Sequence, residues 1–415
     1  MKNLIFSLLA LFCLVSCTKD DDTSEMQPEA ESITILSYLV ANNNLNDCLS
    51  YNVATMYEGL VSMDQPATLL IYWDGQTLIS GKNHLILKYE TDGKGNVNGK
   101  NVNGNLTEDQ ILKEAQILKE YSSQISTDKT VMSMVLQDMV HFSPTDKIGL
   151  VIGSHGSSWL NTISTSHRAI GYDGVYANSI SLPDLTDALL SVGKKFEFLL
   201  LDACYMGTIE TCYYLRNVTD YMISSVMEVP AKGFPYHLLM EDLYKGTVAD
   251  YKKVCQDYIN YYKDIYYNDK NEYAWGTVAL VDADEVQTLT NLLKEEIISN
   301  KDILADYDVT TLQEYGRAGG VHIAYDVEQF VKDLNGGILP NAFGEQLNKT
   351  VLYKGCLEET RSYSDEYSYD VDVSNFCGLG IYIPIASRYK WNAYLKTIEW
   401  CKIAGWNQVS FDWDF

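Results

Sequence analysis

The sequence predicts an α/β fold built on a mostly parallel β-sheet flanked by helices. Two short, almost continuously apolar runs, 147–153 (KIGLVIG) and 196–201 (FEFLLL), are typical of strands that are buried on both faces of a parallel sheet. Between them, 182–192 (LPDLTDALLSV) has apolar residues at helical spacing and predicts a helix. A strand, a helix and a second strand in this order form a βαβ unit, in which the two strands are parallel.

The chain before this unit also alternates between strand and helix patterns. Runs rich in β-branched and aromatic residues predict strands, and turn-spaced apolar residues predict helices. In chain order these are a strand at 33–40, a helix at 45–60, strands at 67–72 and 84–89, and a helix at 108–121 capped by Thr107. The Gly/Asn-rich segment 92–105 predicts an exposed loop, since its single acid, Asp92, falls short of the several carboxylates that calcium takes.

The last third of the chain predicts an α+β subdomain packed on the main sheet. After a further strand at 221–226, the same patterns predict helices at 250–267, 284–300 and 391–400 and strands at 277–281 and 379–384. No Pro- or Ser-rich linker separates these segments from the rest. We therefore divide the chain into a leader (1–16), a flexible acidic tether (17–31), a main domain (32–248) and a packed C-terminal subdomain (249–415).

The N-terminus predicts a lipid-modified leader. Lys2 precedes an apolar run at 4–15, which is too short to span a membrane and closes on Leu14-Val15-Ser16-Cys17. This end resembles the lipobox of bacterial lipoproteins, in which the cysteine becomes the diacylated N-terminus; an ordinary secretory leader with an incidental cysteine is the alternative. Lys19 followed by three aspartates at 20–22 resembles signals that export some lipoproteins to the cell surface, or is only a solvated tether. We expect an outer-membrane lipoprotein of the bacterial cell envelope, anchored through Cys17.

Charge and cysteine content exclude several classes of function. The formal net charge is −25, and a protein without a basic footprint does not bind the nucleic-acid backbone. Of the nine cysteines, Cys13 lies in the leader and Cys17 is the lipid site. The other seven have no regular spacing, so we expect no disulfide framework. No CxxC occurs and the histidines show no ligand spacing, so no metal site is predicted.

Both apolar strands end at a reactive residue. The first is followed by His155 and the second by Cys204. Because the carboxyl ends of parallel strands meet at one edge of a sheet, these side chains are expected to lie close together. An imidazole raises the thiolate fraction of a nearby thiol and can then protonate a leaving amine. The backbone N–H groups of Gly156 and Cys204 are candidates for stabilising an oxyanion.

Each of these residues also has a structural interpretation. A lone cysteine at a strand end is usually a small packed hydrophobe, and a lone histidine after a strand is usually structural. Here, however, a histidine and a cysteine follow two consecutive buried strands, and the histidine has a glycine beside it. This combination favours the catalytic interpretation. A histidine about 50 positions before the cysteine is also the spacing of the caspases, although the peptide around Cys204 is not theirs.

These motifs resemble those of the clostripain family of caspase-like cysteine peptidases, over most of the chain beyond Ile33. His155-Gly156-Ser157-Ser158-Trp159 resembles the family's His-Gly-Ser-Gly-Trp motif. Asp202-Ala203-Cys204 followed by Met206 resembles its nucleophile motif. Supporting likenesses lie at 38–45, at 325–327 with Phe330, and at 378–384.

The resemblance implies a caspase-like sandwich over 32–248 and an endopeptidase that cuts after arginine or lysine. In that picture Cys204 is the nucleophile and His155 the general acid and base. Asp202 would line the pocket for the substrate's P1 side chain, where a carboxylate pairs with a basic group. The resemblance also implies self-cleavage between the two strands, for which Arg168 is the candidate unless it is a structural arginine. It implies a response to calcium in some members, with no cofactor required.

Three positions depart from the family pattern. Lys232 stands where the family often has a second pocket acid, and a cation there repels a basic P1 group unless it swings out or Glu228 neutralises it. Asn42 replaces a common aspartate and Ser158 a usual glycine. The first departure bears on the P1 preference and not on the reaction type.

The sequence thus predicts a lipid-anchored cysteine endopeptidase that acts as a monomer on peptide or protein substrates. The alternative is a surface binding lipoprotein on a catalytically inactive peptidase scaffold. The two hypotheses differ in whether the protein turns over any peptide and in whether the Cys204 thiol is unusually reactive.

Overall fold

The computed structural model describes residues 32–102, 106–160, 170–174, 178–268, 276–317, 321–357, 359–363 and 368–413. The chain from Ser32 to Phe415 forms one compact unit. The predicted leader and tether, with Cys17, lie outside the described residues, as does Arg168. The predicted boundary at 248/249 stays a prediction, and two strands beyond it extend the main sheet.

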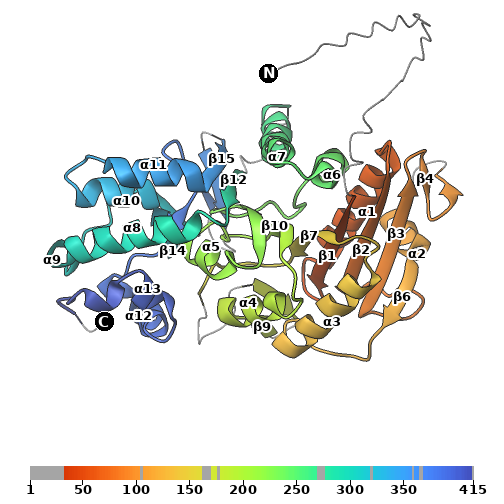
Figure 1. Ribbon diagram of the computed structural model, residues 1–415, viewed down its shortest axis with the longest axis horizontal. Coiled ribbons are helices and arrows are strands. Elements are labelled where there is room, and N and C mark those ends of the chain that lie inside the picture. The colour runs from red at the N-terminus through yellow and green to blue at the C-terminus, as the bar shows by residue number, and fades with distance from the viewer. Residues whose placement is uncertain are drawn as a thin grey trace, which may run out of the picture. The chain divides into compact units, whose positions relative to one another are not determined.

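Five parallel strands form the centre of that sheet (Figure 1). In spatial order they are β11 (Thr219–Ser224), β10 (Phe196–Asp202), β7 (Lys147–Gly153), β1 (Ile33–Ala41) and β2 (Pro66–Gly75). Antiparallel strands extend both sides: β12 (Thr277–Asp282) and β15 (Val351–Cys356) beyond β11, and β3 (Leu85–Asp92), β4 (Asn96–Val97), β5 (Lys100–Asn101) and β6 (Gln116–Glu120) beyond β2. The predicted α/β class with a parallel sheet is confirmed.

Helices cover both faces of the sheet, because the apolar strands present side chains to both sides. On β10, Leu199 and Leu201 belong to one hydrophobic core, and Phe198 and Leu200 to the other. One core includes helices α3 (Lys129–Phe142), α4 (Leu182–Leu190), α5 (Ile209–Leu215) and α8 (Val286–Ser299). The other includes α1 (Asn46–Ser62), α2 (Glu108–Glu114), α6 (Tyr236–Lys245) and α7 (Val248–Asn268). In Figure 1, α6 and α7 lie above the sheet and α3 and α4 below it.

Smaller elements complete the described part of the chain. A second sheet joins β13 (Glu314–Arg317), β14 (Val321–Asp326) and β18 (Gly380–Ile381). Two hairpins pair β8 (Ile170–Asp173) with β9 (Asn178–Ile180) and β16 (Glu359–Tyr363) with β17 (Ser368–Asp372). The remaining helices are α9 (Lys301–Leu304), α10 (Val327–Leu334), α11 (Asn341–Thr350), α12 (Tyr389–Leu395) and α13 (Trp400–Ile403), with 3₁₀ turns at Ala386–Arg388 and Trp406–Gln408.

Four predicted elements are wrong in type or extent. The helix expected at 391–400 is divided into α12 and α13, and the loop expected at 92–105 contains the short paired strands β4 and β5. The helix expected at 108–121 ends at Glu114, and β6 follows from Gln116, because the backbone there pairs with the edge of β3. The capping box of Thr107 and Gln110 starts this helix as predicted. The strand expected at 379–384 is limited to β18, where pairing with β14 covers only two residues.

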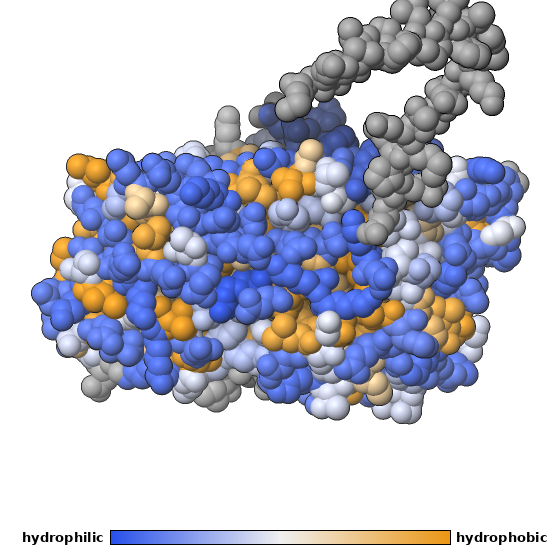
Figure 2. Space-filling view, viewed as in Figure 1, coloured by the Kyte–Doolittle hydropathy of each residue, from blue (hydrophilic) through white to orange (hydrophobic). Residues whose placement is uncertain are grey.

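The visible surface is largely polar (Figure 2). The face seen in Figure 2 is mainly hydrophilic, with small separate hydrophobic patches. Among the described residues, no helix combines the length and the apolar character needed to cross a bilayer.

Candidate active site

The carboxyl ends of β7 and β10 lie level with each other. Gly153, the last residue of β7, pairs with Asp202, the last residue of β10. The Ser154 N–H continues this pairing by donating to the Asp202 carbonyl oxygen at 3.3 Å. His155 and Cys204 each follow two positions after their strand ends. The register therefore sets both residues on loops that leave the same edge of the sheet.

Gly156 brings these two loops into backbone contact. A Cβ added at Gly156 would lie 2.4 Å from the Cys204 carbonyl oxygen and 3.1 Å from the Cys204 nitrogen. Any side chain at this position would collide with backbone atoms, which cannot move aside as a flexible side chain can. The glycine beside His155 is thus what allows the histidine loop to pack on the cysteine loop.

The imidazole of His155 is half-buried and contacted on two sides. Its Nε2 lies 2.7 Å from Oδ1 of Asn44, at the carboxyl end of β1. Its ring meets the Tyr172 ring edge to face, with centroids 5.0 Å apart. The loop is also tied to β8, because the Gly171 N–H donates to the His155 carbonyl oxygen at 2.9 Å.

The thiol of Cys204 is half-buried at a sharp turn. Its Sγ lies 3.8 Å from the Val229 carbonyl oxygen. The next residue, Tyr205, has a φ of +62°, and such a left-handed conformation costs a non-glycine residue on the order of 1 kcal/mol or more. The Tyr205 N–H donates to the Met227 carbonyl oxygen at 3.0 Å, which holds the strained turn in place.

Asp202 is a buried carboxyl group with two hydrogen-bond donors. Its Oδ2 accepts from the Tyr236 hydroxyl at 2.8 Å and from the Phe234 N–H at 3.3 Å. Burial raises the pKa of Asp202 to about 6, and the two donors oppose that rise. Gly233, with a φ of +66°, passes so close that a Cβ there would lie 2.5 Å from Oδ2. The loop carrying Gly233 and Phe234 thus packs directly on the carboxyl group.

Lys232 lies on the same loop, yet its side chain leaves the region of Asp202. The ammonium group lies 5.9 Å from the centroid of the Tyr51 ring on α1 and is exposed. The Lys232 carbonyl oxygen accepts from Asn52 Nδ2 at 2.8 Å. No lysine or arginine of the described ranges forms an ion pair with Asp202. Glu228 is buried at 8% exposure on the segment that leads to this loop.

The other two departures from the family pattern have local explanations. Ser158 has a φ of +60°, a conformation that glycine adopts without cost, and this accounts for the glycine usual there. Its hydroxyl lies 2.7 Å from that of Thr208, which offsets part of the strain. Asn42 donates from Nδ2 to Oδ1 of Asp173 at 2.9 Å. An aspartate at position 42 would place two carboxylates against each other.

Two partners of the predicted residues were missed by sequence reasoning. Tyr236, the donor to Asp202, starts α6, and Asn44, the neighbour of His155, follows β1. The only signal for Asn44 was its place in a run of three asparagines after a buried strand. No local pattern identifies Tyr236 among the 31 tyrosines of the chain.

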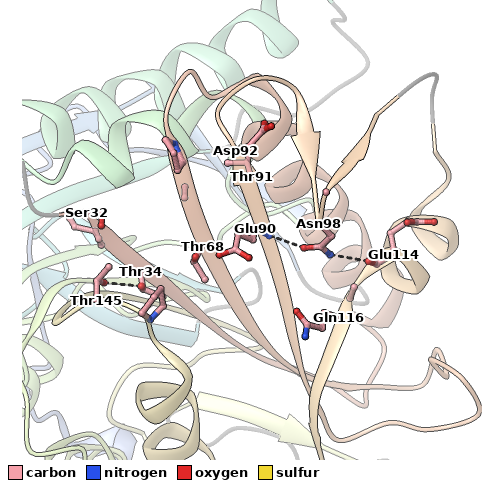
Figure 3. A pocket seen from close by; sticks show the side chains of 16 residues that line it. Ser32, Thr34, Thr68, Glu90, Thr91, Asp92, Asn98, Glu114, Gln116 and Thr145 are labelled. Carbon is pink, nitrogen blue, oxygen red and sulfur yellow. Dashed lines mark hydrogen bonds between the residues drawn. The ribbon is translucent and has the colours of Figure 1, made fainter.

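A large cavity lies away from these residues. It has a volume of about 850 Å³ and is lined by Thr34 and Thr68 near the start of β1 and β2 (Figure 3). Figure 3 shows its polar side chains bonded to one another, such as Thr34 to Thr145 and Asn98 to the Glu114 carbonyl oxygen. Because it opens at the amino ends of the parallel strands, it is separate from the edge that carries His155 and Cys204.

Comparisons with known proteins agree on one family. The model of the clostripain family matches residues 37–400. A secreted C11 cysteine protease from Bacteroides thetaiotaomicron, solved with an irreversible peptide inhibitor, is 24% identical with a TM-score of 0.71, over 91% of this chain and 100% of that one. An inactive zymogen C11 protease from Parabacteroides distasonis is 26% identical with a TM-score of 0.72, over 91% and 99% of the two chains. No curated protein sequence matches.

The family match includes both strand ends and the loops that follow them. It spans β7, β10 and the motifs around His155 and Cys204, and continues into α13. The caspase-like α/β fold shared with the solved C11 proteases agrees with it. The chain therefore belongs to the clostripain family of caspase-like cysteine peptidases.

Proposed function

We propose that this cysteine peptidase is a lipid-anchored endopeptidase that uses Cys204 as nucleophile and His155 as general acid and base. The observation that carries the proposal is the contact of Gly156 with the Cys204 backbone, at the level ends of β7 and β10. It supports an imidazole and a thiol on adjoining loops, which is what proton transfer between them requires.

The proposed reaction follows the usual two steps of thiol peptidases. The Cys204 thiolate attacks the scissile carbonyl carbon, and the carbonyl oxygen gains the negative charge. The Gly156 and Cys204 N–H groups are the proposed donors to that oxyanion. His155 gives its proton to the leaving amine as the C–N bond breaks, which leaves an acyl thioester. A water molecule then loses a proton to His155 and attacks the thioester, which releases the acid and restores the thiol.

We further propose that Asp202 selects arginine or lysine at P1. Its burial supports this role, because a carboxylate in a low-dielectric site gains more from pairing with a cation than one in water. The placement of the Lys232 ammonium group near the Tyr51 ring also supports this role, because a lysine turned toward α1 repels a basic P1 group less than one turned toward Asp202. Glu228, buried on the neighbouring segment, is the second proposed acid of the pocket.

A peptide library that varies only the P1 residue tests this function. The purified protein should hydrolyse peptides after arginine and lysine, and a thiol alkylator should modify Cys204 first. Preference for another P1 residue would contradict the role of Asp202 in P1 selection, but it would still agree with peptidase activity. Lack of turnover on every peptide, with slow alkylation of Cys204, would favour the inactive binding lipoprotein.

Anchoring through Cys17 is proposed from the leader sequence, and the protein is proposed to act at the outer membrane as a monomer. Replacing Cys17 with serine should move the protein from the membrane fraction to the soluble fraction, since a serine cannot take the thioether-linked lipid. The measurement is detergent-free fractionation followed by immunoblotting. The control is the Cys48→Ser variant, whose cysteine lies in α1. A membrane-bound Cys17→Ser protein would contradict the anchor.

We also propose that the chain is made as a precursor that cuts itself, with Arg168 as the cleavage site. The inactive zymogen from Parabacteroides distasonis, which is similar over most of this chain, supports the proposal. The reaction as proposed needs no cofactor. No three His, Cys, Asp or Glu side chains gather as a metal site in the part of the chain that the structure describes, and a response to calcium stays a prediction.

A further inference from the structure

Three consecutive asparagines at the carboxyl end of β1 hold the histidine loop. Asn42 Nδ2 donates to Asp173 Oδ1 at 2.9 Å, and Asn43 Nδ2 donates to the Tyr172 carbonyl oxygen at 2.6 Å. Asn44 Oδ1 lies 2.7 Å from His155 Nε2. The Gly174 N–H returns a bond to the Asn42 carbonyl oxygen at 2.9 Å. Asn42 and Asn43 thus hold the segment that lies beside His155, and Asn44 contacts the imidazole itself.

The base of this arrangement is rigid. Asn43 is buried, and it also donates to the Val40 carbonyl oxygen at 2.9 Å and accepts from the Leu45 N–H at 2.7 Å. These two bonds fix the backbone on either side of Asn44. Asp173 is buried as well and accepts from the Ser126 N–H, which ties the same segment to a third part of the chain. Asn44 therefore presents its amide from a fixed position, although its own side chain is exposed.

The contact between Asn44 and His155 joins the amide oxygen Oδ1 to Nε2 of the imidazole, and it fits the tautomer with the proton on Nε2. An amide oxygen can only accept a hydrogen bond, so Nε2 carries the proton when it faces Oδ1. Nδ1 is then the nitrogen that can take a proton from a thiol. The edge-to-face contact with Tyr172 limits rotation of the same ring. An asparagine holds this orientation without adding charge, whereas an aspartate would stabilise the imidazolium and hinder its loss of the proton.

We infer that Asn44 is a positioning residue for the reaction, which orients His155 and fixes its tautomer. This rests on the proposed role of His155 as general acid and base. In this role Asn44 acts through the imidazole of His155 and not on the substrate. The third member of the site thus comes from β1, on the opposite side of β7 from the strand that carries Cys204.

The test compares Asn44→Ala and Asn44→Asp on a reporter peptide cleaved by the wild-type protein. The alanine variant should lose ~10- to 100-fold in kcat, the cost of a reacting group displaced by about an ångström, with KM within about twofold of wild type. The aspartate variant keeps an acceptor, so most of kcat should return. Its carboxylate should also move the alkaline limb of the kcat/KM profile to higher pH, because it favours the imidazolium.

Asn348→Ala, at an exposed asparagine of α11, is the matched control and should match wild type in both readouts. Full kcat in Asn44→Ala with an unchanged pH profile would overturn the inference. If the alanine variant does not fold, the Asn44→Asp variant tests the inference by itself. An unchanged alkaline limb of its kcat/KM profile would then overturn the inference. The His155→Ala variant distinguishes a failure of the proposed function from a failure of this inference. Peptide hydrolysis by His155→Ala would refute the proposed function. An inactive His155→Ala protein together with a fully active Asn44→Ala protein would refute only the role of Asn44.

Discussion

Replacing Cys204 with alanine is expected to abolish peptide hydrolysis, with a loss on the order of 10⁴-fold or more in kcat, as for other enzymes that lose their nucleophile. The fold should remain, because the thiol is only half-buried and its removal leaves little space unfilled. The measurement is turnover of a peptide that ends in arginine, together with the thermal unfolding midpoint. The same variant should stay a single chain, since a protein that cuts itself needs its own nucleophile.

Cys356→Ala is the matched control for this experiment. Cys356 is also half-buried, and its Sγ likewise lies near a carbonyl oxygen, that of Val373 at 3.6 Å, but it belongs to β15 at the far side of the sheet. That variant should keep wild-type turnover. Turnover retained by Cys204→Ala would end the assignment of the nucleophile. Cleavage of both proteins into the same two fragments would show that another protease performs the cut.

Replacing Asp202 with asparagine is expected to remove the preference for basic P1 residues. Cleavage after arginine should fall ~100- to 5,000-fold in kcat/KM, because a buried cation left without its partner carboxylate costs about 3–5 kcal/mol. Cleavage after a neutral residue such as glutamine should change little. The measurement is the ratio of kcat/KM for two peptides that differ only in arginine or glutamine at P1.

The pH dependence of the wild-type protein follows from the same group. Since burial raises the pKa of Asp202 to about 6, the carboxylate dominates above that pH and the neutral acid below it. Only the carboxylate pairs with a P1 cation, so KM for the arginine peptide should rise as the pH falls below about 6. A bound cation favours ionisation of Asp202, so kcat at saturation should persist to lower pH. The glutamine peptide and the Asp202→Asn variant should lack this dependence of KM.

Asp326→Asn offers a matched control for the carboxylate. Asp326 is fully buried and accepts from a tyrosine hydroxyl, that of Tyr315 at 2.8 Å, and from backbone N–H groups, much as Asp202 does. It caps α10 and belongs to the second sheet. Its replacement should lower stability and leave the arginine-to-glutamine ratio unchanged. An unchanged ratio in Asp202→Asn would instead assign P1 selection to other residues, with Glu228 the first to test.

Local sequence patterns predicted the centre of the fold well. The apolar runs 147–153 and 196–201 became β7 and β10 with nearly the same bounds, because residues buried on both faces of a sheet must be apolar at every position. The helix between them and the capped start of α2 were predicted for equally local reasons. The edge of the sheet was predicted less well. Residues 116–120 have a helical pattern, but their pairing with β3 outweighs that helix propensity.

The sequence by itself determined which residues follow the two buried strands and their order along the chain. His155 and Cys204 follow buried strands, and the rule that parallel strands end at one edge predicted that both leave the same edge of the sheet, as the level ends of β7 and β10 show. Only the tertiary structure decided what surrounds them: Asn44 beside the imidazole across 111 positions, Tyr236 on Asp202 across 34, and Lys232 turned onto Tyr51. Periodicity reports which face of an element is buried, whereas these contacts depend on how distant elements pack, which no local pattern encodes.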